Sequence, residues 1–130
     1  MAGVENLFSF QNLLVWQKSR ELVKEVYSII ATFPQTECFS MADQLRRAVI
    51  SVPANIAEGS AKTSDKDQIR FIEIAYGSLM ETYCLLQLSE DIGLVSSDVI
   101  LPLATRIQEI ARMLSGLRRN KQENQTYFKH

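Results

Sequence analysis

Histidine is almost absent from this 130-residue sequence, and the single copy, His130, is the last residue. A terminal side chain is not held firmly enough to serve in a catalytic triad or a metal site, so we expect neither. The di-iron sites of helical bundles use Glu-x-x-His on two helices, and no histidine is available for them. The sequence therefore predicts a protein that is not an enzyme and carries no metal or cofactor.

Cysteine is scarce as well, and the two copies, Cys38 and Cys84, lie far apart without zinc-ligand spacing. A free cysteine usually behaves as a small apolar residue, so we expect both to be buried and reduced. No apolar run approaches the ~20 residues that span a bilayer. Residues 1–10 also lack the basic start and apolar run of a signal peptide. These absences predict a cytoplasmic protein without a membrane segment.

Five glycines and three prolines leave few points at which a regular element must end. Long uninterrupted elements with apolar residues three and four positions apart are typical of amphipathic helices. The periodicity predicts a single all-α domain over residues 1–130. Its four helices are expected at about residues 12–33, 37–61, 65–91 and 97–120, followed by a frayed tail at 121–130. Because the links are short, we expect an antiparallel up-down-up-down four-helix bundle.

Helix ends and interruptions can be placed from local chemistry. Thr36 and Ser64 are suitable N-cap residues for the second and third helices, and Gly93 suits a left-handed C-cap. Pro53 lies inside the second helical pattern, where it removes a backbone donor. Because the apolar register continues beyond it to Ile56, we predict one helix kinked at Pro53.

The third helix illustrates how the buried face is chosen. Its apolar residues recur at helical spacing, and we expect them to form or flank the core stripe: Ile69, Phe71, Ile72, Ala75, Tyr76, Leu79, Tyr83, Leu85, Leu86, Leu88 and Ile92.

Charge is balanced overall, at a net −1, but it is unevenly distributed. Residues 65–98 contain seven acidic and two basic residues, whereas residues 106–130 contain six basic and two acidic ones. Three of these bases, Arg118, Arg119 and Lys121, have two interpretations: phosphate contacts, or favourable charge near a helix C-terminus.

A polar stripe beside the apolar face of the second helix is the clearest candidate for a contact site. It contains Gln44, Arg47, Ser51, Asn55 and Glu58 at helical spacing, with Arg46 adjacent. The stripe is either a solvated face or a surface that contacts another subunit or ligand. Small residues cluster nearby, at the end of the second helix (Ala54, Ala57, Gly59, Ser60, Ala61) and in the third (Ala75, Gly77, Ser78). They indicate a close helix contact, either within the chain or between subunits.

Three sequence motifs resemble a known family. Residues 12–17 (NLLVWQ) resemble its opening, residues 44–48 and 51–59 (QLRRA and SVPANIAEG) its most distinctive motif, and residues 74–81 (IAYGSLME) its third-helix motif. The family is that of four-helix bundle proteins named for intervening sequences of 23S ribosomal RNA genes. The resemblance covers residues 8–117 and implies a homopentamer around a central channel, in a family without an established activity. The chain is also similar to the accessory variability determinant of diversity-generating retroelements, a basic pentamer that engages nucleic acid and a reverse transcriptase.

Two functional hypotheses remain at this stage. The first is an oligomeric interaction protein whose partner is another protein. The second is a binder of structured RNA or other nucleic acid, in which bases repeated around a ring add through avidity. The candidate contact residues for either are Arg46, Arg47, Ser51, Asn55, Glu58, Arg118, Arg119 and Lys121.

Overall fold

The computed structural model describes residues 7–37 and 40–128 of the chain. It contains four α-helices: α1 (Leu14–Ile30), α2 (Met41–Ser60), α3 (Asp65–Asp91) and α4 (Ser97–Phe128). Two short 3-10 helices, η2 (Ser9–Asn12) and η3 (Gln35–Glu37), precede α1 and α2. The described residues contain no strand, so the all-α class predicted from the sequence is confirmed.

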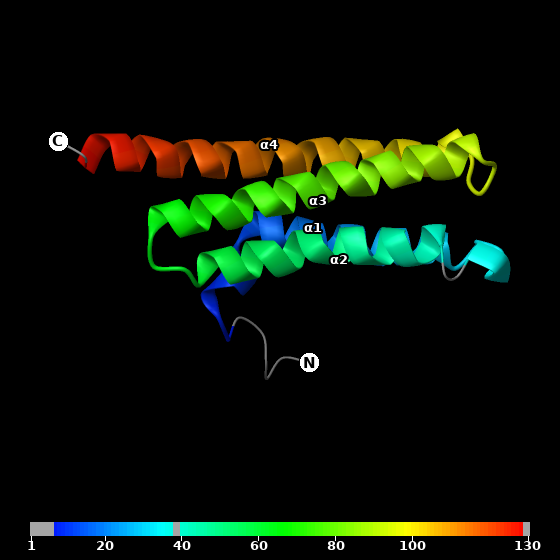
Figure 1. Cartoon of the computed structure of the whole chain (residues 1–130), viewed down its shortest axis with the longest axis horizontal. Coiled ribbons are helices and arrows are strands. Elements are labelled where there is room, and N and C mark those ends of the chain that lie inside the picture. The colour runs from blue at the N-terminus through cyan, green and yellow to red at the C-terminus, as the bar shows by residue number, and fades with distance from the viewer. Residues whose placement is uncertain (1–6, 38–39, 129–130) are drawn as a thin grey trace.

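The four helices form an elongated bundle (Figure 1). The α1–α2 and α3–α4 connections lie at one end of it, and the α2–α3 connection lies at the other. Successive helices therefore run in opposite directions. α2 is closely packed against α3, α3 against α4, and α1 against both α2 and α4.

The bounds of α3 are those predicted from the sequence, whereas the bounds of the other three helices differ from the prediction. α1 and α2 are shorter than predicted, because the chain enters 3-10 turns on either side of Pro34. Thr36 lies in η3, and Ser40 is the residue that precedes α2, so the N-cap predicted at Thr36 is wrong. α2 continues through Pro53 without a break, and the kink stays a prediction.

The tail is the largest departure. α4 continues to Phe128, so the prediction of a frayed segment from residue 121 is wrong for its backbone. Residues 121–125 are Lys, Gln, Glu, Asn and Gln, without the glycine or proline that would end a helix. α4 consequently extends well past the level at which α1 begins (Figure 1).

Both predicted caps of α3 are confirmed. The Ser64 hydroxyl accepts a hydrogen bond from the Asp67 amide at 3.1 Å. At the other end Gly93 has a φ of +84°, which glycine adopts without steric cost. Its amide donates to the Glu90 carbonyl at 3.0 Å, while the Leu94 amide donates to Ser89 at 2.8 Å. This pair of bonds is a Schellman motif, which satisfies the last carbonyls of α3.

The core runs along the whole bundle and draws on all four α-helices. Its most deeply buried aliphatic side chains are Leu22, Val26, Leu45, Val49, Val52, Leu79, Leu86, Ile110 and Leu114. Three buried hydroxyls also lie inside, at Ser19, Thr82 and Ser89, and apolar periodicity did not predict them. Each donates to the carbonyl four residues earlier at 2.7–2.8 Å, so burial leaves no unpaired hydroxyl proton.

Two apolar residues near the end of α3 are exposed. Leu88, predicted to lie beside the core stripe, is 44% exposed, and Ile92, predicted to be part of it, is 59% exposed. Leu88 lies about 200° around the helix from the buried Leu86, since each residue turns the helix by about 100°. Ile92 follows the last residue of α3, so it lies beyond the helical face that packs on the core.

Candidate functional site

The outer face shared by α2 and α3 contains the predicted polar stripe. Ser51 on α2 and Ser78 on α3 are hydrogen-bonded through their hydroxyls, with the oxygens 2.8 Å apart. The Asn55 amide nitrogen donates to both the hydroxyl and the carbonyl oxygen of Ser51, at 2.8 Å each. Ser51 and Asn55 therefore lie in contact with each other, and Ser51 connects α2 to α3 through Ser78.

The charged members of the stripe are placed differently. Arg47 is exposed and pairs with Asp43 one turn earlier, at 3.2 Å. Glu58 is also exposed, and Arg46 is half-buried. A solvent-exposed pair one turn apart contributes little to stability, so Arg47 and Glu58 are available for contacts beyond the chain.

Exposed residues on α3 lie beside this polar stripe. Positions 74, 77, 81, 84 and 88 repeat at three- and four-residue steps, and all five are exposed: Ile74, Gly77, Glu81, Cys84 and Leu88. Ile74 and Glu81 lie one turn before and after Ser78, so they flank the hydroxyl that contacts α2. We name this surface the α2–α3 face, made of Arg47, Ser51, Asn55, Glu58, Ile74, Gly77, Ser78, Glu81, Cys84 and Leu88.

The cysteine prediction is wrong for Cys84, which is exposed on the α2–α3 face. Its position in the repeat, between Gly77 and Leu88, places it on the outer side of α3. Cys38 lies outside the described residues.

The two groups of small residues serve different purposes. A Cβ atom added at Gly59 would lie 2.8 Å from the Cβ of Phe71, so this glycine permits a close approach of α2 to α3. A Cβ atom added at Gly77 would meet no atom within 4 Å. The intramolecular explanation thus accounts for Gly59, while Gly77 leaves an open spot on the α2–α3 face.

The basic residues of α4 are not gathered into a free patch. Arg118 pairs with Glu73 of α3 at 3.5 Å, Arg119 is exposed, and Lys121 is half-buried beside a small cavity. Because α4 continues to Phe128, all three lie outside its last turn. The interpretation as charges in the last turn, interacting with the helix dipole, is therefore wrong.

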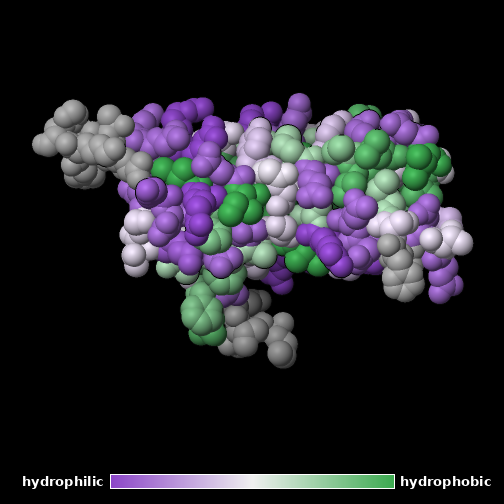
Figure 2. All heavy atoms as spheres, in the orientation of Figure 1, coloured by the Kyte–Doolittle hydropathy of each residue, from purple (hydrophilic) through white to green (hydrophobic). Residues whose placement is uncertain are grey.

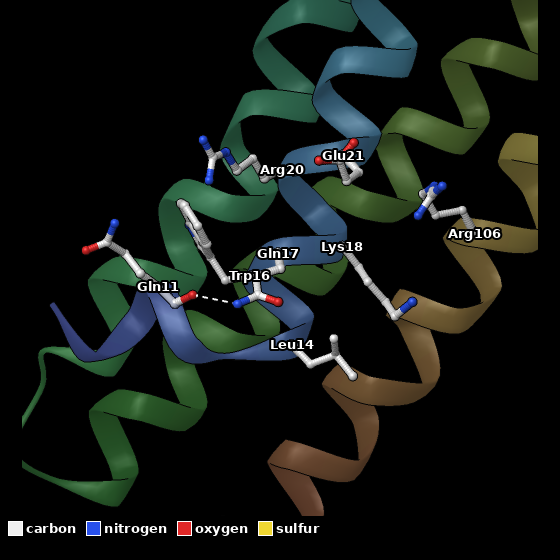
Figure 3. Close-up of a pocket in the computed structure, with 8 residues that line it drawn as sticks. All are labelled: Gln11, Leu14, Trp16, Gln17, Lys18, Arg20, Glu21 and Arg106. Carbon is white, nitrogen blue, oxygen red and sulfur yellow. Dashed lines mark hydrogen bonds between the residues drawn. The ribbon is translucent and has the colours of Figure 1, made fainter. Parts of the chain in front are cut away.

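A groove between the start of α1 and α4 has a volume of about 520 Å³ and several charged side chains (Figure 3). Two of its cations are neutralised by acids on the opposite helix. Lys18 pairs with Glu109 at 2.6 Å, and Arg106 pairs with Glu25. The hydrogen bond from Lys18 lowers the pKa of Glu109 below its ordinary value. These pairs join α1 to α4 and leave the groove without a free acid–base pair.

Aromatic contacts form the other wall of the groove. The Arg20 guanidinium lies over the Trp16 ring, 5.4 Å from its centroid, and Phe10 meets Trp16 edge-on at 5.0 Å. The Gln17 amide donates to the Gln11 carbonyl at 2.8 Å, as the dashed line in Figure 3 shows. This wall fixes η2 against α1, so the groove supports the fold at the start of the first helix.

Comparison with known proteins places the chain in a family. Residues 11–116 match the 23S rRNA-intervening sequence protein family. The chain belongs to this family. No curated protein sequence matches it. The family is one of unknown function and is not a known enzyme family.

A solved structure shows the same fold as this 23S rRNA-intervening sequence protein. It is a protein of unknown function from the S23 ribosomal protein family of Bacteroides thetaiotaomicron, with a TM-score of 0.75 and 24% sequence identity. The match covers 81% of this chain and 98% of that one. The family and the bundle anticipated from the three motifs are thereby confirmed.

The described residues contain no group of three or more His, Cys, Asp or Glu side chains that could hold a metal ion. In the same part of the chain, no helix is long and apolar enough to cross a membrane. Ser78, which sequence reasoning assigned only to a group of small residues, is the α3 partner of the polar stripe. Its place in the motif at 74–81 was the available signal, because that motif and the one at 51–59 meet at this contact.

Proposed function

We propose that this family member is a non-enzymatic, homo-oligomeric interaction protein, assembled as a cytoplasmic homopentamer, that binds a protein partner. The observation that supports assembly is the composition of the α2–α3 face. Ile74 is 42% exposed and Leu88 is 44% exposed, and Gly77 offers space between them for a neighbouring side chain. Exposed aliphatic side chains grouped along one helix face are typical of protein–protein contacts.

The polar groups of this face favour the same proposal. Both hydrogen bonds of the Asn55 amide nitrogen go to Ser51, and one of the Ser51 and Ser78 hydroxyls donates to the other. Covering these groups leaves one hydroxyl proton to be paired across the interface, because a buried unpaired donor would weaken it. Arg47 and Glu58 lie around the polar centre and are exposed, as residues of an interface rim are.

Figure 2 shows a second region of hydrophobic surface at the end of the bundle where α3 meets α4. Its exposed aliphatic residues include Ile92, at 59%, and Leu101, at 69%. The α2–α3 face would serve assembly, and the region at the α3–α4 end would remain for a protein partner. Both proposed contacts are hydrophobic, in agreement with the small net charge of −1.

The assembly is tested by measuring molar mass with light scattering over a wide dilution range. We expect a mass near that of a pentamer of the 14.8 kDa chain, and we expect Ile74→Glu to reduce it to one chain while helix content is kept. Leu14→Glu is the matched control, because Leu14 is 55% exposed on α1. A monomeric wild-type protein at high concentration would contradict the proposal, as would an unchanged mass for Ile74→Glu.

The alternative function is binding of structured RNA or other nucleic acid. It is favoured by the placement of Lys66 and Arg70 at the start of α3, in a pocket that the acids Asp67 and Glu73 and Gln122 of α4 also line. Arg118 of α4 pairs with Glu73, so basic residues of two helices lie near this end of the bundle. Phosphate contacts release counterions, so such binding should fall steeply with salt. Affinity that is flat between low and moderate salt would exclude it.

A pull-down from cell lysate, with and without nuclease, separates the two functions. A protein recovered despite nuclease, and lost with Ile92→Ser/Leu101→Ser, supports the protein partner. A specific nucleic acid that is lost with nuclease and weakened in Arg46→Ala/Arg47→Ala or Arg118→Ala/Arg119→Ala supports the alternative.

A further inference from the structure

The outer side of α2 carries a second row of side chains beside the polar stripe. We name it the α2 row, made of Arg46, Ile50 and Ala54 at four-residue steps. Ile50 is 44% exposed, Ala54 is also exposed, and Arg46 is half-buried. Each member directly precedes a residue of the polar stripe, so the row lies about 100° around α2 from that stripe. α2 therefore presents two different surfaces to solvent.

Opposite charges on these two surfaces lack partners within the chain. Among the described residues, neither Arg46 on the α2 row nor Glu81 on the α2–α3 face takes part in an ion pair. Arg47, by contrast, pairs with Asp43 on its own helix. Glu81 is exposed, and Arg46 carries a planar guanidinium that suits a carboxylate. The two charges are therefore complementary groups for a contact between two copies of the chain.

The two surfaces also match in height along the bundle. The hydrogen bond between Ser51 and Ser78 sets α2 and α3 at the same level there, and the helices run in opposite directions (Figure 1). Counting from this bond, at about 1.5 Å per residue, places three pairs of residues within about 3 Å in height. These pairs are Ala54 with Ile74, Ile50 with Gly77, and Arg46 with Glu81. Each pair joins a small residue to a large one, or a base to an acid.

Ring symmetry explains why two different surfaces are needed. In a closed ring with an odd number of copies, every chain meets its two neighbours through two different surfaces. In a ring of five these surfaces face directions about 108° apart, close to the angle of about 100° between the α2 row and the polar stripe. Rotation about an axis parallel to the bundle leaves every height unchanged. Residues at the same height in one chain therefore also lie at the same height in neighbouring chains.

We propose that the α2 row of one subunit packs on the α2–α3 face of the next. Ile50 fills the open spot at Gly77, Ala54 leaves room for Ile74, and Arg46 pairs with Glu81. This inference rests on the proposed assembly and adds which two surfaces meet in it. The partner of the α2–α3 face is thus a different surface of a second copy, and not a second α2–α3 face.

Exchanging the two charges tests the pair. Arg46→Glu and Glu81→Arg each place like charges opposite one another at every contact of the ring. We expect each to raise the concentration needed for assembly by about tenfold or more, at unchanged helix content. Arg46→Glu/Glu81→Arg restores opposite charges and should restore assembly, as measured by light scattering over a dilution range. Arg112→Glu, which reverses an exposed arginine on α4, is the control and should leave assembly unchanged.

Mixing two variants shows which surfaces meet. Ile50→Glu damages only the α2 row, and Ile74→Glu damages only the α2–α3 face, so each variant alone should be a monomer. Their equimolar mixture retains one intact row and one intact face. We expect this mixture to form a dimer that contains one chain of each variant.

Three outcomes would overturn the inference. The first is a mixture that stays monomeric, and the second is a double charge variant that assembles no better than the single ones. The third is a wild-type pentamer that Ile74→Glu dissociates and Ile50→Glu leaves intact, which would leave the proposed assembly standing. A monomeric wild-type protein would instead contradict the assembly and this inference with it, so the two failures are distinguishable.

Discussion

Two contacts between helices in this bundle are built in opposite ways. α2 and α3 approach closely at Gly59 and are joined by the neutral side chains of Ser51, Asn55 and Ser78. α1 and α4 are joined at their surface by long charged side chains, in the pairs Lys18–Glu109 and Arg106–Glu25. The α2–α3 contact depends on a glycine that leaves room for the neighbouring helix. The α1–α4 contact depends on attraction between charged side chains.

This difference determines what each contact tolerates. A backbone that approaches within van der Waals distance cannot move aside for an added methyl group, since protein interiors are closely packed. Flexible charged side chains at the surface can find new positions when a neighbour changes, and salt screens their attraction. The α2–α3 contact is therefore the less tolerant of substitution, and its outer face is suited to a fixed assembly surface.

The largest effect is expected from Gly59→Ala. The added Cβ atom would lie 2.8 Å from the Phe71 Cβ, which is fixed to the backbone, so the helices must separate. We expect the free energy of unfolding to fall by about 1–3 kcal/mol. Urea titration followed by circular dichroism measures it.

The matched control is Gly116→Ala, since a Cβ atom there meets nothing within 4 Å. It should raise the free energy of unfolding by about 0.5–1 kcal/mol, because alanine is the better helix former. If Gly59→Ala were stabilising to the same extent, the close approach of α2 and α3 would be refuted.

A smaller effect is expected from Ser78→Ala, which removes the hydroxyl contact between the helices. Loss of one hydrogen bond should cost about 0.5–1.5 kcal/mol. A double-mutant cycle with Ser51→Ala measures the coupling of the two hydroxyls. Ser28→Ala is the control, because its exposed hydroxyl bonds only to its own helix, and it should change stability by less than about 0.5 kcal/mol. Additive effects of Ser51→Ala and Ser78→Ala would contradict the contact.

These two contacts also show what the sequence could and could not predict. The polar stripe, the small residues and the caps at Ser64 and Gly93 were visible because each has a local chemical signature. The hydrogen-bond partner of Ser51 could not be predicted, because the sequence of the second helix does not determine which residue of the third helix lies opposite it. The predicted fourth helix is shorter than α4, because the last turns of α4 lack the apolar repeat from which its length is predicted.

A still smaller effect is expected from Arg106→Gln, which removes one ion pair between α1 and α4. A partly exposed pair of this kind contributes about 0.2–1 kcal/mol, and the loss should shrink as salt is added. The loss caused by Ser78→Ala should stay constant over the same salt range. Urea titrations at low and high salt make the comparison, and an equal salt dependence for both variants would remove the distinction between the neutral and the charged contact.

The smallest expected effect concerns the protonation of Glu109. Lys18 lowers its pKa in the folded state, so the carboxylate favours folding at pH values above its ordinary pKa. This contribution is lost as the pH falls through the lowered pKa. We expect Lys18→Met to raise the pKa of Glu109 toward its ordinary value, as measured by NMR of the side-chain carboxyl carbon. Lys24→Met, which breaks an exposed pair with Glu21 on the same helix, should leave Glu109 unchanged. An unshifted Glu109 in Lys18→Met would mean that this pair does not join α1 to α4 in solution. The charged contact would then rest on Arg106 and Glu25.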